Sequence, residues 1–458
     1  MRLLIHDLSE TDAHALAGRI GADVTLGGEE VDWLGCQGCF GCWTKTPGRC
    51  VMRDGIGDMG ALLASVDDLV IASRLSYGGF SAVTKRALDR SIPYLSPFFH
   101  TVSGEMHHQR RHANRISLHA LFHGPLTDEA ADIARGIVQA NAVNLAADVA
   151  EVRFATDTTA LVSEDYLEPP FATEKTGDAA EKAIAGGRVP SDPSVPMPAS
   201  DDRGDRKALL LGCSPKAQGG ASGFLAEQLA GLLGERGVVT SQGQVRRMSL
   251  AGSHGPARHV PADIVPDPAE VLSADMLAFV FPLYVDGLPS HLIAYLDELT
   301  DALRDATTSG GAERSKTPAD ASPTRPIVYG VVNLGFYESC QGSLALRVLG
   351  EWCAENGLAW GGGVSIGAGG MLQGLADVPA DKGPRAPVTA ALSSLAQDMS
   401  AGTSHGVSLV KPGIPRLAYQ EAAHLGWRMQ GRSNGLSRHK LDATPTDWSS
   451  VDVEGKTA

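Results

Sequence analysis

Residues 276–299 read MLAFVFPLYVDGLPSHLIAYLDEL and decide the fold class of the C-terminal half of the chain. The run Met276–Phe281 is apolar throughout, which is typical of a strand buried on both faces of a sheet. A tight loop follows at Pro282–Gly287, and Leu288–Leu303 has the apolar spacing of a helix. A buried strand, a short loop and a helix in this order predict a parallel sheet covered by helices.

The same alternation of strands and helices runs through both halves of the 458-residue chain. Strands are predicted at Arg2–Asp7, within Val24–Trp33, and at Leu69–Ser73, Ile116–Phe122, Ala150–Phe154, Lys207–Cys213, Met276–Phe281, Ile327–Val332 and Gly362–Ile366. Helical segments separate them, so we expect a duplicated α/β fold. Each copy is predicted to be a doubly wound, parallel, five-stranded sheet.

Composition divides the chain into four parts. Residues 1–156 form the first predicted domain, and residues 157–206 form an acidic linker rich in Ala, Pro, Ser, Asp and Glu. Residues 207–402 form the second domain. Residues 403–458 are interpreted as an arm with a helix at Ile414–Gln430, used for packing or dimerisation, and a loose tail.

The overall charge excludes some classes of partner. The formal net charge is −14 and the pI is near 5.4, so nothing attracts nucleic acid or an anionic membrane. The N-terminus lacks the apolar segment of a signal peptide, and no apolar stretch approaches a membrane span. We therefore expect a cytoplasmic protein. The mixed run His107–His112, HHQRRH, is interpreted as a solvated loop.

A loop rich in small residues follows the first predicted strand of the second half. Residues 210–225 read LLGCSPKAQGGASGFL, so a strand runs through this loop into a helix. Backbone N–H groups at such a helix start attract a phosphate group. The predicted phosphate contacts are Ser214, Lys216, Gln218, Gly219, Gly220 and Ser222.

Two further loops of the second half follow buried strands. In open parallel sheets, ligands bind outside the carboxyl ends of the strands. The expected contacts with a planar ring are Pro282, Leu283, Tyr284, Val285, Asp286 and Gly287. The loop after the next strand adds Asn333, Gly335 and Phe336 to this set.

These motifs resemble the flavodoxin-like NADPH-dependent FMN reductase family across residues 207–400. The resemblance rests on Ser214-Pro215-Lys216 and on Pro282, Tyr284 and Gly287. It implies a flavodoxin-like fold, FMN as cofactor and NAD(P)H as electron donor. It places the phosphate group on the loop 214–222 and the isoalloxazine ring along residues 283–287.

Four of the seven cysteines lie close together in the first half. Cys36, Cys39, Cys42 and Cys50 form the pattern C-x2-C-x2-C-x7-C. Four thiolates in a compact run are typical of iron–sulfur ligation, whereas zinc sites more often use two separated pairs. A redox-active dithiol and a loop without metal remain open alternatives.

The first half, residues 1–155, also resembles the iron–sulfur flavoproteins and their flavodoxin-like relatives. This resemblance implies a 4Fe-4S cluster on the four cysteines and a flavin edge at Ser76–Phe80. However, Asp7, Glu10 and Asp12 place carboxylates where a phosphate would sit, and like-charge repulsion disfavours FMN there. Tyr77 and Phe80 are then expected to be packing or dimer residues.

The sequence therefore predicts an FMN-dependent oxidoreductase that passes electrons from NAD(P)H to a small-molecule or protein acceptor, with a 4Fe-4S cluster as one route. Since the cofactor carries the chemistry, no side chain is assigned as catalytic. An electron-transfer flavoprotein without its own substrate and a cofactor-free structural or regulatory protein are the alternatives. We expect either a homodimer or a pseudo-dimer formed within the chain.

Overall fold

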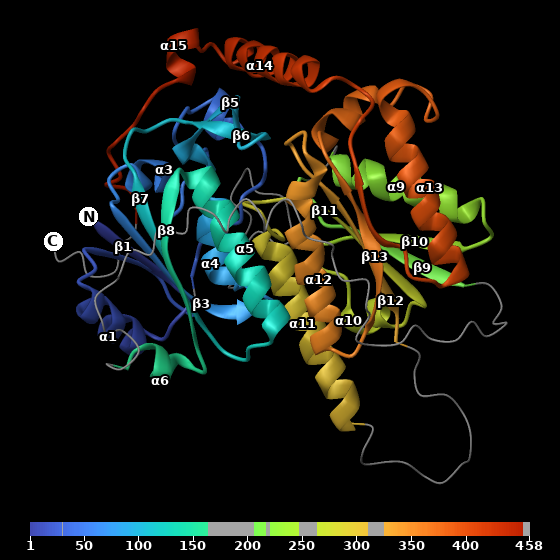
Figure 1. Ribbon diagram of the computed structural model, residues 1–458, viewed down its shortest axis with the longest axis horizontal. Helices are drawn as coiled ribbons and strands as arrows, with labels where there is room; N and C mark the ends of the chain where they lie inside the picture. The colour runs from blue at the N-terminus through green and yellow to red at the C-terminus, as the bar shows by residue number, and fades with distance from the viewer. Residues whose placement is uncertain (30, 164–205, 217–219, 247–262, 310–324, 452–458) are drawn as a thin grey trace.

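The computed structural model describes residues 1–29, 31–163, 206–216, 220–246, 263–309 and 325–451. The N-terminal half forms a sheet with five parallel strands in the order β2-β1-β3-β7-β8 (Figure 1). Its strands are β1 (Arg2–His6), β2 (Val24–Gly27), β3 (Asp68–Ser76), β7 (Ile116–His123) and β8 (Ala147–Ala155), with β4 (Gly79–Phe80) antiparallel to β3. Its helices are α1 (Glu10–Ile20), α2 (Gly41–Thr44), α3 (Met59–Leu63), α4 (Ala82–Asp89), α5 (Asp128–Leu145) and α6 (Thr158–Leu161).

The C-terminal half repeats this strand order and adds one strand, giving β10-β9-β11-β12-β13-β14, all parallel. Its strands are β9 (Lys207–Gly212), β10 (Val239–Gln244), β11 (Met276–Pro282), β12 (Ile327–Asn333), β13 (Ala359–Ile366) and β14 (Gly406–Val410). Its helices are α9 (Ala221–Gly234), α10 (Pro268–Leu272), α11 (Ser290–Ser309), α12 (Ser343–Glu355), α13 (Ala386–Ala401), α14 (Arg416–Ser433) and α15 (Arg438–Leu441). The predicted fold class of two tandem doubly wound sheets is confirmed. The sixth strand, β14, is new and comes from the segment interpreted as an arm.

Side chains along the central strands alternate between an inner and an outer core. In β1, Leu3 and Ile5 belong to the inner core, whereas Leu4 packs on the outer face with α1. In β11, Phe279 faces inward and Val280 faces the outer helices α9 and α13. Successive side chains of a strand point to opposite faces, so each sheet is covered on both sides. None of the described helices has both the length and the apolar character needed to cross a bilayer.

The two halves share their inner core. Helices α4 and α5 of the first half pack against α11 and α12 of the second (Figure 1). The Tyr77 hydroxyl donates a hydrogen bond to Asp297 Oδ1 at 2.8 Å and lies 3.1 Å from Thr300 Oγ1. Arg74 Nη2 pairs with Asp297 Oδ2 at 2.6 Å. Tyr77 is therefore an interface residue between the halves, consistent with its expected packing role.

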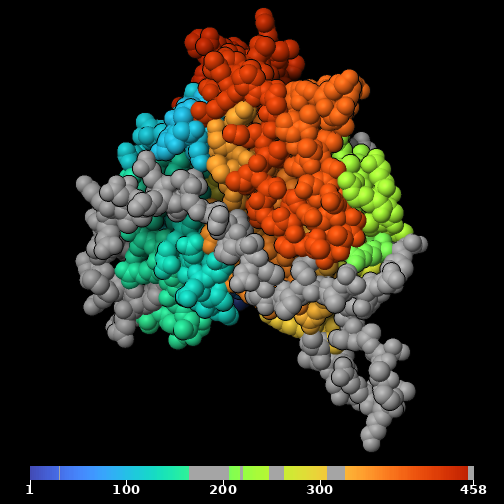
Figure 2. All heavy atoms as spheres, turned by 45° about the vertical axis from the view of Figure 1, so that its right-hand side comes forward, coloured from blue at the N-terminus to red at the C-terminus, as the bar shows by residue number. Residues whose placement is uncertain are grey.

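The C-terminal segment returns to the first half after β14. Helix α14 packs against α2 and against β5 (Leu95–Val102), and Figure 2 shows the red segment at the top of the molecule. Arg49 Nη2 donates to the Asp447 carbonyl at 2.8 Å, and Val451 is buried in the shared core. The prediction of a loose tail is therefore wrong as far as Val451, because apolar and ionic contacts fix it to the first half.

A hairpin of β5 and β6 (Glu105–Arg110) is inserted between α4 and β7. The prediction of a solvated loop at His107–His112 is wrong, because this run contains much of β6 and buries His107, Arg111 and His112. Burial is tolerated because partners are supplied, such as the Leu441 carbonyl, which accepts from Arg111 Nη1 at 2.9 Å.

Candidate functional site

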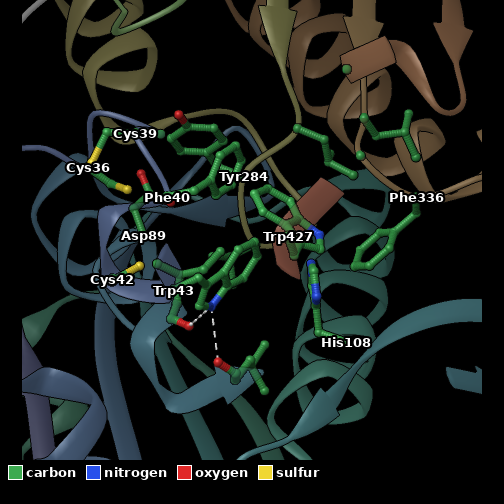
Figure 3. Close-up of a pocket in the computed structure, with 18 of the residues that line it drawn as sticks. Cys36, Cys39, Phe40, Cys42, Trp43, Asp89, His108, Tyr284, Phe336 and Trp427 are labelled. Atoms are coloured by element: carbon green, nitrogen blue, oxygen red, sulfur yellow. Dashed lines mark hydrogen bonds between the residues drawn. The ribbon is translucent and has the colours of Figure 1, made fainter. Parts of the chain in front are cut away.

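A cavity of about 570 Å³ lies between the two halves at the carboxyl ends of β9, β11 and β12. The second half lines it with Lys216, Leu283–Asp286 and Leu334–Phe336. The first half contributes residues of the cysteine loop, defined here as residues 36–50, and helix α14 also lines the cavity (Figure 3). This is the edge of a parallel sheet where ligands bind. The structure thus brings the cysteine loop and the expected flavin loops to one cavity.

The loop after β11 is a tight turn, called here the ring turn (Tyr284–Gly287). Tyr284 N donates to the Gly287 carbonyl at 3.1 Å, and Gly287 N donates back to the Tyr284 carbonyl at 3.0 Å. The two central residues have positive φ angles, 42° at Val285 and 57° at Asp286, as in a type I′ turn. Their N–H groups donate to no residue in the described ranges, so they are available to a ligand.

Asn333, at the end of β12, connects the three loops of the second half. Its Nδ2 donates to Ser222 Oγ at 2.8 Å and to the Phe281 carbonyl at 3.0 Å. Its carbonyl accepts from Leu283 N at 2.8 Å. Gly335 and Phe336 follow it and line the cavity. Pro282 ends β11 and leads directly into Leu283. The role of Asn333 in this arrangement is to fix the loops relative to one another.

The start of α9 has the open donors that a phosphate group requires. Gly220 is the N-cap residue and provides no side-chain cap. The N–H groups of Ala221, Ser222 and Gly223 donate to no residue that the structure describes. Unpaired N–H donors and the helix dipole at such a start favour an anion. Ser214 Oγ accepts from Lys216 N at 3.3 Å, whereas Gln218 and Gly219 lie outside the described residues.

Lys216 lies against the cysteine loop instead of standing free beside the helix start. Its Nζ is 5.4 Å from the centroid of the Phe40 ring, within cation–π range. Burial lowers the pKa of Lys216, and the nearby Cys39 and Cys36 oppose this effect. The ammonium group of Lys216 therefore lies between the two halves of the chain.

All four clustered cysteines, Cys36, Cys39, Cys42 and Cys50, line the cavity. Figure 3 shows three of them, Cys36, Cys39 and Cys42. Burial raises the pKa of Cys36 to about 12 and also raises the pKa of Cys42, so these thiols stay protonated without a bound cation. Within the described ranges, no group of three or more His, Cys, Asp or Glu side chains is arranged to hold a metal ion. The arrangement therefore does not fit a zinc ion, and the expected 4Fe-4S cluster is without support.

In the first half, the loop after β1 and the start of α1 correspond to the loop after β9 and the start of α9, but they are built differently. Helix α1 is capped by Ser9, which accepts from Asp12 N, and its first turn carries Glu10 and Asp12. The carboxylate of Asp7 accepts from Arg74 N at 2.9 Å and lies 3.3 Å from His123 Nε2. Burial alone would raise the pKa of Asp7, but hydrogen bonds from His123, Ser81 and Arg74 lower it overall. An internal carboxylate occupies this position, which agrees with the expectation that a phosphate is disfavoured there.

Aromatic side chains form one wall of the cavity, and most of them were not among the predicted site residues. Phe40 stacks on Trp43 at 5.1 Å between centroids, and Trp427 of α14 lies edge-on to both at 5.2 and 5.3 Å. His108 of the hairpin lies 4.6 Å from Trp43, and burial lowers its pKa to about 3, so it is neutral. Hairpin and α14 are additions to the repeated fold. The aromatic residues of the hairpin and of α14 were the only sign in the sequence that these elements belong to the site. An aromatic residue alone does not indicate which surface its element covers.

These observations fit FMN. The ring turn offers two free N–H groups beside an aromatic-lined cavity, and α9 offers an open helix start at the neighbouring strand. One end of the site thus suits a planar apolar ring with a polar edge, and the other suits a phosphate. In the first half, the start of α1 is capped by Ser9 and carries Glu10 and Asp12, so it does not offer the open donors that α9 offers.

Comparison with solved structures finds proteins that are each similar to a part of this chain at low sequence identity. The Trp repressor binding protein from Bacillus subtilis is 17% identical, with 35% of this chain and 86% of that chain covered and a TM-score of 0.26. A flavone reductase is 12% identical, covering 47% and 70%, with a TM-score of 0.28. The NAD(P)H:quinone oxidoreductase from Methanothermobacter marburgensis is 16% identical, covering 51% and 100%, with a TM-score of 0.21.

No protein-family model matches the chain, and no curated protein matches it. The structural scores are all far below 0.5, and the identities are below 25%.

Proposed function

We propose that the chain is an FMN-dependent oxidoreductase that takes electrons from NAD(P)H and passes them to a small-molecule or protein acceptor. One observation carries the proposal: the ring turn and the uncapped start of α9 follow adjacent strands, and the ring turn and Lys216 line the aromatic-lined cavity. Bound FMN supplies hydride acceptance and one-electron transfer.

The side chains of the site bind and orient. The N–H groups of Val285 and Asp286 are proposed to meet the polar edge of the ring, and those at the start of α9 to meet the phosphate group. Asn333 holds the two sites in register through Ser222. Phe40, Trp43 and Trp427 are proposed to exclude water from the cavity. Their rings also offer an apolar surface against which an acceptor could bind.

The tandem arrangement supplies within one chain the partner that the predicted dimer requires, so we propose an internal pseudo-dimer with one flavin. The cysteine loop forms part of the cavity wall next to Tyr284. Because the described side chains do not form a metal site, no electron-transfer step is assigned to the cysteines.

The test is a titration of the full chain with FMN and, in parallel, with riboflavin, which lacks the phosphate group. We expect FMN to bind with quenched fluorescence and a raised melting temperature, and riboflavin to bind more weakly because it cannot use the start of α9. The loaded chain should oxidise NAD(P)H continuously when a quinone acceptor is added. Iron analysis of the same sample, purified without oxygen, examines the cysteine loop.

Equal affinity for FMN and riboflavin would contradict the phosphate site. Absence of binding by both flavins would contradict the proposed function as a whole. Flavin binding without steady NAD(P)H oxidation would favour the electron-transfer alternative.

A further inference from the structure

The ring turn has a sequence that does not favour its own conformation. Type I′ turns need positive φ at both central positions and strongly prefer Asn-Gly or Asp-Gly. Here the two positions are Val285 and Asp286. A β-branched residue at positive φ is an outlier, and such conformations persist only where the surroundings over-determine them. Something outside the turn must therefore hold it.

The first half supplies these contacts from the end of α5. Asn144 Nδ2 donates to both carboxylate oxygens of Asp286, at 2.9 and 2.8 Å. Asn141 Nδ2 donates to Asp286 Oδ2 at 3.1 Å and to the Val285 carbonyl at 3.2 Å. Residues three apart lie on the same side of a helix, so both amides reach one turn.

A third contact comes from α4. Lys85 Nζ donates to the Tyr284 carbonyl at 2.6 Å and is paired with Asp89. Asp89 Oδ2 in turn accepts from Ser290 N, at the start of α11, at 2.9 Å. Lys85, Asp89, Asn141 and Asp286 are all buried to at least 96% of their surface. Side chains of the other half thus fix the turn at its first residue, Tyr284, and at its two central residues.

We propose that Asn144 is a positioning residue, through which the N-terminal half holds the ring turn of the C-terminal half in its left-handed, ligand-ready conformation. This inference rests on the proposed function for the identity of the ligand. It assigns the first half, which lacks a phosphate site of its own, the role of a permanent partner that preorganises the flavin site.

Hydrogen exchange tests the positioning without any flavin. In the flavin-free chain, Asn144→Ala should increase amide exchange in the segment 282–288, because the turn loses its two bonds to Asp286. The matched control is Asn114→Ala. Asn114 Nδ2 likewise makes two hydrogen bonds, to the Leu63 and Val66 carbonyls at 2.9 and 3.0 Å, but within the first half and away from the turn. Its loss should leave exchange in the segment unchanged.

FMN binding and a rescue variant complete the test. Asn144→Ala should weaken FMN binding about tenfold, as expected for the loss of two hydrogen bonds to a buried side chain. Adding Val285→Gly should restore most of the affinity, since glycine adopts positive φ without strain. If Asn144→Ala fails to fold, Asn141→Ala, which removes the bond to the Val285 carbonyl, is measured in the same way.

The outcomes separate the two proposals. Unchanged exchange and unchanged FMN affinity in Asn144→Ala would overturn the inference, as would a loss of affinity that Val285→Gly does not restore. If the native chain rejects FMN while Asn144→Ala still loosens the segment 282–288, the proposed function fails and the positioning role stands.

Discussion

At the scale of single residues, close contacts across the two halves decide the shape of the site. Gly38 has a φ angle of 61°, and a Cβ there would overlap the Tyr284 hydroxyl. Glycine is therefore needed both for the backbone conformation and for the approach of the cysteine loop to the ring turn. Nothing local to Gly38 in the sequence indicates that Tyr284 lies against it.

His108 gives a prediction about pH. Burial lowers its pKa to about 3, whereas in the unfolded chain it titrates near its ordinary value of about 6.5. Between these values the unfolded state binds more protons, so the free energy of unfolding falls as the pH is lowered through this window. We expect His108→Phe, a ring that suits the contacts with Trp43 and Phe99, to reduce this dependence by up to about 1.4 kcal/mol per pH unit.

Urea unfolding of both proteins at several values between pH 4.5 and 7 measures the effect. Parallel curves of unfolding free energy against pH for the two proteins would contradict a buried, neutral His108.

At the scale of secondary-structure elements, the repeated strands and helices were predictable and the additions were not. The apolar runs Leu69–Ser73 and Met276–Phe281 lie within β3 and β11, because strands buried on both faces leave a continuous apolar signal. The helix predicted at Ile414–Gln430 is α14, at Arg416–Ser433. Its contact with the cavity was not predictable, since helix periodicity does not identify the surface that a helix covers.

Helix α14 carries a matched pair of residues for a second prediction. Trp427 packs on Phe40 and Trp43, whereas Leu425 is 57% exposed. Trp427→Ala should loosen α14 from the cysteine loop, lower the free energy of unfolding by about 1–3 kcal/mol and expose the cavity to water. Leu425→Ala should change it by less than about 0.5 kcal/mol.

Limited proteolysis within residues 416–433 and denaturant unfolding measure both variants. Equal sensitivity of the two variants to protease would mean that Trp427 does not attach the helix.

At the scale of the whole molecule, the two halves behave as one body because their inner core is continuous. Apolar residues from α4, α5, α11 and α12 belong to a single cluster, and Arg347 of α12 pairs with Glu129 and Asp132 of α5 at 2.8 and 2.7 Å. Domains that share a large apolar interface are expected to unfold together, unlike domains joined only by a linker. The native chain should therefore show one thermal transition.

Overpacking this interface provides the matching test. Gly136 of α5 faces Leu344, and a Cβ at Gly136 would lie 2.9 Å from Leu344 Cδ2. Gly136→Leu should force α5 and α12 apart, at a cost of about 1–3 kcal/mol, and broaden or split the transition. Gly231→Leu on the outer helix α9, where nothing lies within 4 Å, is the control that keeps a single transition. Calorimetry of the native chain and the two variants measures the number and width of the thermal transitions. Two transitions in the native chain would contradict a shared core.

The repeated α/β fold, the strand ends that carry the candidate site and the acidic start of the first half could all be predicted from the sequence. These features follow from local patterns: apolar runs, glycine-rich loops and the charges of adjacent residues. Only the tertiary structure decided that α5 of one half holds the turn of the other, that the cysteine loop adjoins Tyr284 and that α14 covers the cavity. Such contacts join residues more than a hundred positions apart, and they depend on how complete elements pack, which no local spacing records.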